Sequence, residues 1–133
     1  MNSIILMSHG EMAKETLNSA KMILGDQINY PVVSMEPNDG IEGTMSKLEA
    51  ILETIPQQHH IVILADLLGG TPANVAMMKA SVDSRIEVLT GMNLGTVLES
   101  FFNLEKVDLG EHLLEIGRQG IQQPKLEISD DEE

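Results

Sequence analysis

Two residues of this 133-residue chain could together make a reactive imidazole. His9 follows the short apolar run 4–7, and Asp66 follows a second apolar run, 61–65. A carboxylate that accepts a hydrogen bond from one ring nitrogen fixes the tautomer and leaves the other nitrogen as a nucleophile. Taken alone, His9 could be a solvated loop residue, and Asp66 could simply satisfy N–H groups of its own loop. The chemistry therefore depends on whether the fold brings the two residues together.

The turn after Asp66 could bind an anion such as a phosphate. Gly69 and Gly70 permit positive φ and a close approach of the backbone. Thr71 suits the N-cap of a following helix, and Pro72 suits its first position. A helix N-terminus offers N–H groups and the positive end of the helix dipole to an anion. A plain capped turn would use the same residues, so the run by itself fits either interpretation.

Five further residues are expected to line the same crevice. They are Ser8 and Gly10 beside His9, Asn74 in the helix after Pro72, and Gly91 and Asn93 after the apolar run 86–89. The turn 90–93 repeats the pattern of a strand end, a glycine and a polar cap. Capping of the next helix explains that pattern equally well.

Several common catalytic sites are missing from the sequence. It has no phosphate-binding P-loop motif and no Gly-x-Ser-x-Gly elbow. The absence of cysteine excludes disulfides, thiolate metal sites and cysteine nucleophiles. No spacing of histidine and carboxylate residues indicates a metal site, so we expect neither metal nor cofactor. We expect His59 and His60, which precede the run 61–65, to be solvated.

An alternation of apolar runs and helical patterns predicts the elements that position these residues. Strands are expected at 4–7, 30–35, 61–65 and 86–89, each followed by a helix, with a short further helix over 109–116. Four successive strand–helix units imply a parallel sheet with helices on both faces. The predicted fold is therefore α/β, a three-layer, flavodoxin-like, doubly wound sheet with strand order 2-1-3-4.

This topology predicts where a ligand would bind. In open α/β sheets, ligands bind at the carboxyl ends of the strands, at the point where the strand order reverses. That point lies here between the first and third strands, so His9 and Asp66 should meet. Pro31 falls in the second strand, and the order places this strand at an edge, where the missing N–H does least harm.

Composition narrows the class of protein. The chain has 21 acidic and 8 basic residues and a net charge of −13, which argues against binding to nucleic acid or to an anionic membrane surface. No apolar run approaches the length of a membrane span, and no basic region precedes the first apolar run as in a secretory signal. We therefore expect a cytoplasmic protein. Aromatic residues make up only 2%, which disfavours a flavin-binding module.

Four segments occur in an order that is hard to obtain by chance. They are Ser8-His9-Gly10, Met22-Ile23-Leu24-Gly25, the run from Asp66 to Asn74, and Thr90-Gly91-Met92-Asn93-Leu94. Together they resemble the mannose-type enzyme IIA of the bacterial sugar phosphotransferase system. The match extends from about residue 4 to residue 121, and its most specific part is the run 66–74.

The resemblance implies a histidine phosphocarrier. His9 would accept a phosphoryl group from the carrier HPr and pass it to the IIB component, which serves the IIC and IID membrane permease. Asp66 would orient the imidazole, and Thr71 stands where the family has a small hydroxyl residue near the phosphate. A related alternative is the phosphocarrier subunit that serves dihydroxyacetone kinase. A receiver-like phosphoaspartate switch is disfavoured because it needs an acidic pair where this chain has Ser8 and His9.

The resemblance also suggests a homodimer. Its final strands would exchange between subunits, which here would use residues 121–128 beside the fourth strand, although Pro124 makes this segment a poor strand. We expect one IIA-like phosphocarrier domain over residues 1–128 and a disordered acidic tail over 129–133.

Overall fold

The computed structural model describes residues 1–127. Four parallel strands form one sheet in the order β2-β1-β3-β4, so the predicted α/β fold and strand order are confirmed. The elements of the described residues are, in order, β1 (Asn2–His9), α1 (Met12–Leu24), β2 (Val32–Met35), α2 (Gly40–Leu52), β3 (His60–Ala65), α3 (Thr71–Ala80), β4 (Ile86–Leu89), α4 (Leu94–Phe101) and α5 (Leu109–Gln119).

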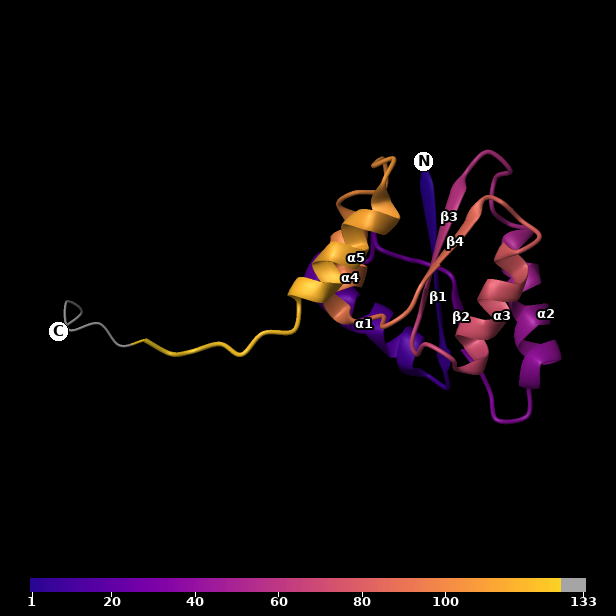
Figure 1. Ribbon diagram of the computed structural model, residues 1–133, viewed down its shortest axis with the longest axis horizontal. Helices are drawn as coiled ribbons and strands as arrows, with labels where there is room; N and C mark the ends of the chain where they lie inside the picture. The colour runs from indigo at the N-terminus through magenta and orange to yellow at the C-terminus, as the bar shows by residue number, and fades with distance from the viewer. Residues whose placement is uncertain (128–133) are drawn as a thin grey trace.

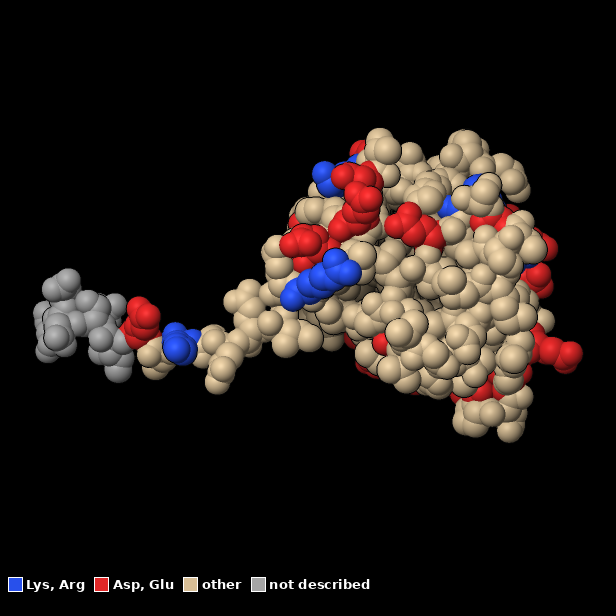
Figure 2. Space-filling model, viewed as in Figure 1, with Lys and Arg blue, Asp and Glu red and all other residues tan. Residues whose placement is uncertain are grey.

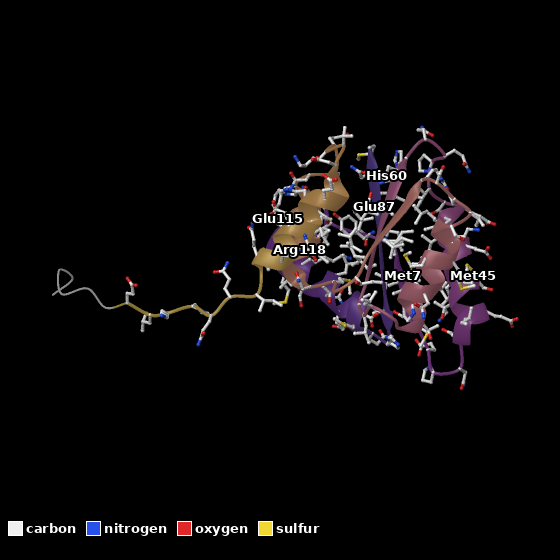
Figure 3. All side chains as sticks on the ribbon, viewed as in Figure 1. Met7, Met45, His60, Glu87, Glu115 and Arg118 are labelled. Atoms are coloured by element: carbon white, nitrogen blue, oxygen red, sulfur yellow. The ribbon has the colours of Figure 1, made fainter. Side chains whose placement is uncertain are left out.

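The sheet lies between two helix layers. Figure 1 shows α1, α4 and α5 on one face and α2 and α3 on the other. Along β1, Ile4 and Leu6 are buried in the cluster under the first layer. Ile5 and Met7 are buried in the cluster under the second layer, where Met45 of α2 also packs (Figure 3). Because both faces of a central strand are covered, the middle of the strand is apolar at successive positions, which explains the unbroken apolar runs 4–7 and 61–65.

The register brings the carboxyl ends of the two central strands to the same edge. β1 and β3 pair from Asn2↔His60 to Met7↔Ala65. The backbone N–H of Asp66 then donates to the carbonyl of Met7 at 3.1 Å, which continues the parallel ladder by one bond. The first residue after β3 is thereby held beside His9, the last residue of β1.

Some element boundaries differ from the predicted ones. β2 begins at Val32, just after Pro31, whose carbonyl accepts the N–H of Leu6 at 3.1 Å. The prediction of Thr71 as the N-cap of α3 is wrong, because Gly70 holds that position and Thr71 is the first helical residue. α5 extends to Gln119, beyond the predicted end at 116.

The segment after α5 contains no helix or strand over residues 121–127. Its side chains are exposed, and it extends away from the body of the molecule (Figure 1). A strand exchanged between subunits needs the sheet edge of a second chain, so the exchange stays a prediction. Residue 128 of that expected strand and the expected acidic tail 129–133 lie outside the described residues.

Candidate active site

His9 and Asp66 are in direct contact at the carboxyl edge of the sheet. Nδ1 of His9 and Oδ2 of Asp66 are 2.7 Å apart, and the backbone N–H of His9 donates to the same Oδ2 at 3.0 Å. An ionised carboxylate can only accept hydrogen bonds, so Nδ1 carries the proton and Nε2 holds a lone pair. The imidazole is 45% exposed, whereas the Asp66 side chain is only 8% exposed. A buried carboxylate thus holds an accessible ring in one tautomer.

The second oxygen of Asp66 makes the carboxylate dependent on His9. Oδ1 is buried and has no hydrogen-bond partner within residues 1–127. A buried charge is costly unless donors surround it, and both donors that reach this carboxylate belong to His9. The imidazole therefore stabilises Asp66 while Asp66 orients the imidazole.

The free edge of the imidazole faces the start of α3. A Cβ atom built on Gly70 would lie 2.7 Å from Cε1 and 3.4 Å from Nε2 of His9, so the ring packs against the backbone of the N-cap. The first-turn N–H groups of an α-helix have no partner within the helix, and Pro72 lacks one of them. An anion on Nε2 would therefore lie at the positive end of the α3 dipole.

Ser8 and Gly10 build the turn that holds His9. The Ser8 side chain is buried, and its Oγ accepts the backbone N–H of Ala13 at 2.7 Å. The same hydroxyl donates to the carbonyl of Gly10 at 3.3 Å. Gly10 has a φ of 53°, which glycine adopts most readily, and its N–H donates to Met35 at 2.8 Å. The Ser8 hydroxyl is thus engaged in capping the first turn of α1.

The remaining predicted residues divide between two places. Asn74 lies on α3, and its Nδ2 donates to the carbonyl of Gly69 at 3.3 Å, so both belong to the turn around Gly70. Gly91 and Asn93 instead line a cavity of about 320 Å³ between the end of β4 and α5, and neither His9 nor Asp66 lines that cavity. Asn93 also forms a capping box with Thr96, whose N–H donates to Asn93 Oδ1 at 2.8 Å.

The other histidines form pairs that the sequence analysis missed. Nε2 of His60 lies 2.9 Å from Oε2 of Glu87, and the two residues lie together in Figure 3. Nδ1 of His59 lies 2.8 Å from the hydroxyl of Ser3, so these two partly exposed histidines also form side-chain contacts. His59 and His60 lie at the amino ends of the strands, the opposite edge from His9. Among residues 1–127, no three His, Asp or Glu side chains are close enough to hold a metal ion.

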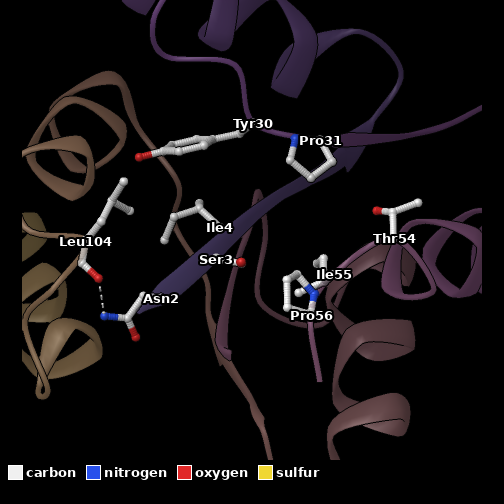
Figure 4. Close-up of a pocket in the computed structure, with 9 residues that line it drawn as sticks. All are labelled: Asn2, Ser3, Ile4, Tyr30, Pro31, Thr54, Ile55, Pro56 and Leu104. Atoms are coloured by element: carbon white, nitrogen blue, oxygen red, sulfur yellow. Dashed lines mark hydrogen bonds between the residues drawn. The ribbon is translucent and has the colours of Figure 1, made fainter. Parts of the chain in front are cut away.

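A cavity of about 280 Å³ also opens at the amino ends of the strands. Figure 4 shows it between Asn2, Tyr30 and Leu104, with Asn2 donating to the carbonyl of Leu104 at 2.8 Å. Burial raises the pKa of the Tyr30 hydroxyl to about 12, and a hydrogen bond with Ser100 partly opposes that shift. Ser3, whose hydroxyl contacts His59, is among the residues that line this cavity, whereas neither His9 nor Asp66 lines it.

The turns around the site carry acidic side chains and backbone dipoles but, apart from His9, no basic side chain. The turns 8–11, 66–72 and 90–93 contain no lysine or arginine. On the face shown in Figure 2, acidic side chains are spread more widely than basic ones. Among residues 1–127, no helix has both the length and the apolar character needed to cross a membrane.

Comparisons with known proteins show which family the chain belongs to. Residues 3–116 match the family model EIIA-man, described as the PTS system fructose IIA component. The fructose-specific EIIA component of Bacillus subtilis (strain 168) is 33% identical over 113 residues, covering 85% of this chain and 73% of that protein. The mannose-specific EIIAB component of Escherichia coli (strain K12) is 27% identical over 123 residues; the match covers 90% of this chain but only 38% of that longer protein.

Two solved structures share the fold over almost the whole chain. The mannose/sorbose-specific IIA subunit from Enterococcus faecalis is 41% identical, with a TM-score of 0.90, and the match covers 96% of this chain and 98% of that one. The EIIA component from Streptococcus agalactiae is 26% identical, with a TM-score of 0.83, and the match covers 92% and 97% of the two chains. Sequence and fold together show that this chain belongs to the EIIA-man family, the mannose-type IIA components of the sugar phosphotransferase system.

Proposed function

We propose that this chain is a histidine phosphocarrier in which Nε2 of His9 accepts a phosphoryl group from phospho-HPr and passes it to the IIB component. The observation that carries the proposal is the 2.7 Å hydrogen bond between Nδ1 of His9 and Asp66, which leaves Nε2 as the nucleophile. Through IIB the phosphoryl group would reach the sugar taken up by the IIC and IID membrane components. A carrier that meets these partners works in the cytoplasm.

The transfer step needs little covalent help from the protein. The phosphorus–nitrogen bond of the donor phosphohistidine breaks as Nε2 of His9 forms a bond to the same phosphorus. The proton on Nδ1 stays hydrogen-bonded to Asp66, whose negative charge stabilises the positive charge that develops on the ring. Phosphoryl transfer passes through a loose transition state, so in-line positioning of donor and acceptor nitrogens matters most.

Backbone groups are the chain's own means of holding the phosphoryl group. That group adds a charge of roughly −1.5 to −2. The N-terminus of α3 and the turn at Gly69 and Gly70 offer N–H groups and a dipole, with the Thr71 hydroxyl nearby in sequence. Because no lysine or arginine occurs in these turns, stabilisation stays modest. A carrier must release what it accepts, and modest stabilisation suits that task.

The proposed partners follow from charge and from an open sheet edge. With a net charge of −13, the chain would meet a basic surface on HPr most rapidly. We also propose a homodimer, because β4 is an edge strand and the apolar cavity beside it is lined by Leu89, Leu114 and Ile121. Residues 121–128 of a second chain could add a strand at that edge.

The proposal is tested by labelling. Incubation with HPr, the kinase that phosphorylates HPr, and labelled phosphoenolpyruvate should give an acid-labile, alkali-stable label on the wild-type chain. The label should vanish in His9→Ala and persist in the matched control His112→Ala, because His112 pairs instead with Glu99 at 3.0 Å. A label that persists in His9→Ala would refute the assignment of His9 as the acceptor.

A further inference from the structure

Gly70 has a backbone conformation that does not require glycine. Its φ of −78° and ψ of 161° are extended, and any L-residue adopts them. Gly69 and Gly10 differ, because their φ values of 86° and 53° lie in the left-handed region that favours glycine. At the N-cap of α3, a serine, aspartate or asparagine would add a side-chain hydrogen bond that is absent here. Local structure therefore gives no reason for glycine at position 70.

The His9 imidazole supplies the reason. A Cβ atom on Gly70 would lie 2.7 Å from Cε1 of His9, far inside the ordinary carbon–carbon contact of about 3.5–4.0 Å. Its other near neighbours are the Leu67 carbonyl oxygen at 3.3 Å and Nε2 of His9 at 3.4 Å, so the ring is the main obstacle. Nδ1 of that ring is already held by Asp66 at 2.7 Å, so a shift away from position 70 would act on this hydrogen bond.

We propose that Gly70 is a positioning residue for His9. The absence of a side chain at position 70 leaves the space in which the imidazole keeps Nδ1 on Asp66 and presents Nε2 beside the start of α3. A larger residue at this position forces the ring or the start of α3 to move, and either shift changes the position of the ring relative to the helix. The consequence for phosphoryl transfer rests on the proposed function, whereas the consequence for the ring does not.

The first test is a stability cycle between positions 70 and 9. Gly70→Ala should lower the melting temperature by roughly 5 °C in the wild-type background, because overpacking must displace either the ring or the α3 turn. In the His9→Ala background the imidazole is absent, so Gly70→Ala should leave the melting temperature unchanged or raise it. Gly95→Ala, whose Cβ would meet only Asn93 Oδ1 at 3.4 Å, is the control that should not depend on His9. Equal shifts for Gly70→Ala in both backgrounds would overturn the proposal.

The second test observes the ring itself. Nitrogen NMR of the His9 imidazole should show the Nδ1-protonated tautomer in the wild-type chain and a loss of that preference in Gly70→Ala, as in Asp66→Ala. Phosphorylation by phospho-HPr should slow by about 10²-fold in Gly70→Ala. In the Asp66→Ala background, Gly70→Ala should slow transfer only a little further, because the His9 ring has already lost its orientation there.

The two proposals fail in different ways. An unlabelled wild-type chain would refute the proposed function, while the stability cycle and the NMR spectrum would still decide the role of Gly70. Slow transfer in Gly70→Ala with an unchanged tautomer would mean that the side chain only blocks the phosphoryl group, and would overturn the positioning role. Gly95→Ala should leave both tautomer and transfer unchanged.

Discussion

Oδ2 of Asp66 accepts two hydrogen bonds from His9, one from the ring and one from the backbone. One carboxylate oxygen thus holds both the ring and the backbone of the same residue. The proposed function requires the imidazole to be exposed enough to meet two partner proteins in turn. In that function the pair depends on the negative charge of Asp66.

The first prediction at the scale of single residues concerns the negative charge of Asp66. Asp66→Asn keeps the shape of the side chain but removes the charge that stabilises a phosphorylated imidazole, so transfer from phospho-HPr should slow by about 10²-fold. Single-turnover phosphorylation measures the rate, and circular dichroism checks that the fold is kept. The matched control is Asp26→Asn, at an exposed position, which should transfer at the wild-type rate. Unchanged transfer in Asp66→Asn would contradict the role assigned to the negative charge of Asp66.

The second prediction concerns Tyr30, the only tyrosine in a chain without tryptophan. The ultraviolet absorbance of its phenolate should titrate at about pH 12 in the folded chain, against the ordinary value of 10.0 in denaturant. Because folding raises this pKa, the stabilisation is fully present below pH 10 and is lost as pH rises towards 12. Alkaline denaturation curves should show that loss. A folded-state midpoint near 10 would contradict the burial of the hydroxyl.

At the scale of elements, short polar turns at the carboxyl ends of the strands begin the helices. Ser8 accepts the Ala13 N–H in the first turn of α1, and Asn93 accepts the Thr96 N–H in the first turn of α4. α3 has a glycine at its N-cap and no capping side chain, and α2 likewise has no side-chain cap hydrogen bond at Asp39. The helix that begins beside the His9 ring therefore keeps its first turn open to an anion, whereas α1 and α4 have a side-chain acceptor in theirs.

The capping box of α4 supports a prediction of stability. Asn93→Ala removes the acceptor for the Thr96 N–H and should lower the free energy of unfolding by about 1 kcal/mol, measured in urea. Asn93→Ser can still cap the helix, so its free energy of unfolding should fall much less. Phosphoryl transfer should stay near wild type in both variants, because the cavity that Asn93 lines does not include His9. A large loss of transfer in a folded Asn93→Ala would place Asn93 in the reactive crevice instead.

At the scale of the whole molecule, the outer edge of the sheet at β4 is the place where the proposed dimer would form. β4 has no neighbour on its outer side within residues 1–127, and Ile121 is 89% exposed where the chain leaves α5. An open edge of this kind invites a further strand. The proposed dimer would cover both the edge and the apolar side chains beside it.

Truncation tests the exchange of the final segment. A chain that ends at Gly120 keeps α5 whole and should be a monomer in analytical ultracentrifugation, whereas the full chain should be a dimer. Replacing Ile121 by Asp in the full chain should weaken the dimer in the same direction, since the cavity that Ile121 lines is mostly apolar. A truncated chain that stays a stable dimer would remove the exchange.

The sequence by itself determined the layers, the strand order and the meeting of His9 with Asp66. Parallel strands buried on both faces favour unbroken apolar runs, so the runs 4–7 and 61–65 indicated the central strands directly. Once two such strands are neighbours, the residues that follow them must share an edge. The pairing of positions 9 and 66 was therefore a consequence of topology that local patterns could reveal.

Only the tertiary structure decided how the side chains at that edge are used. The sequence placed the N-cap of α3 at Thr71, whereas the structure places it at Gly70, against the imidazole. The same holds for the buried hydroxyl of Ser8 and for the pairing of His60 with Glu87. The periodic spacing of apolar residues in a sequence indicates which positions of a helix or strand are buried. A contact between residues far apart in the sequence depends on the direction and spacing of their side chains, which no local pattern encodes.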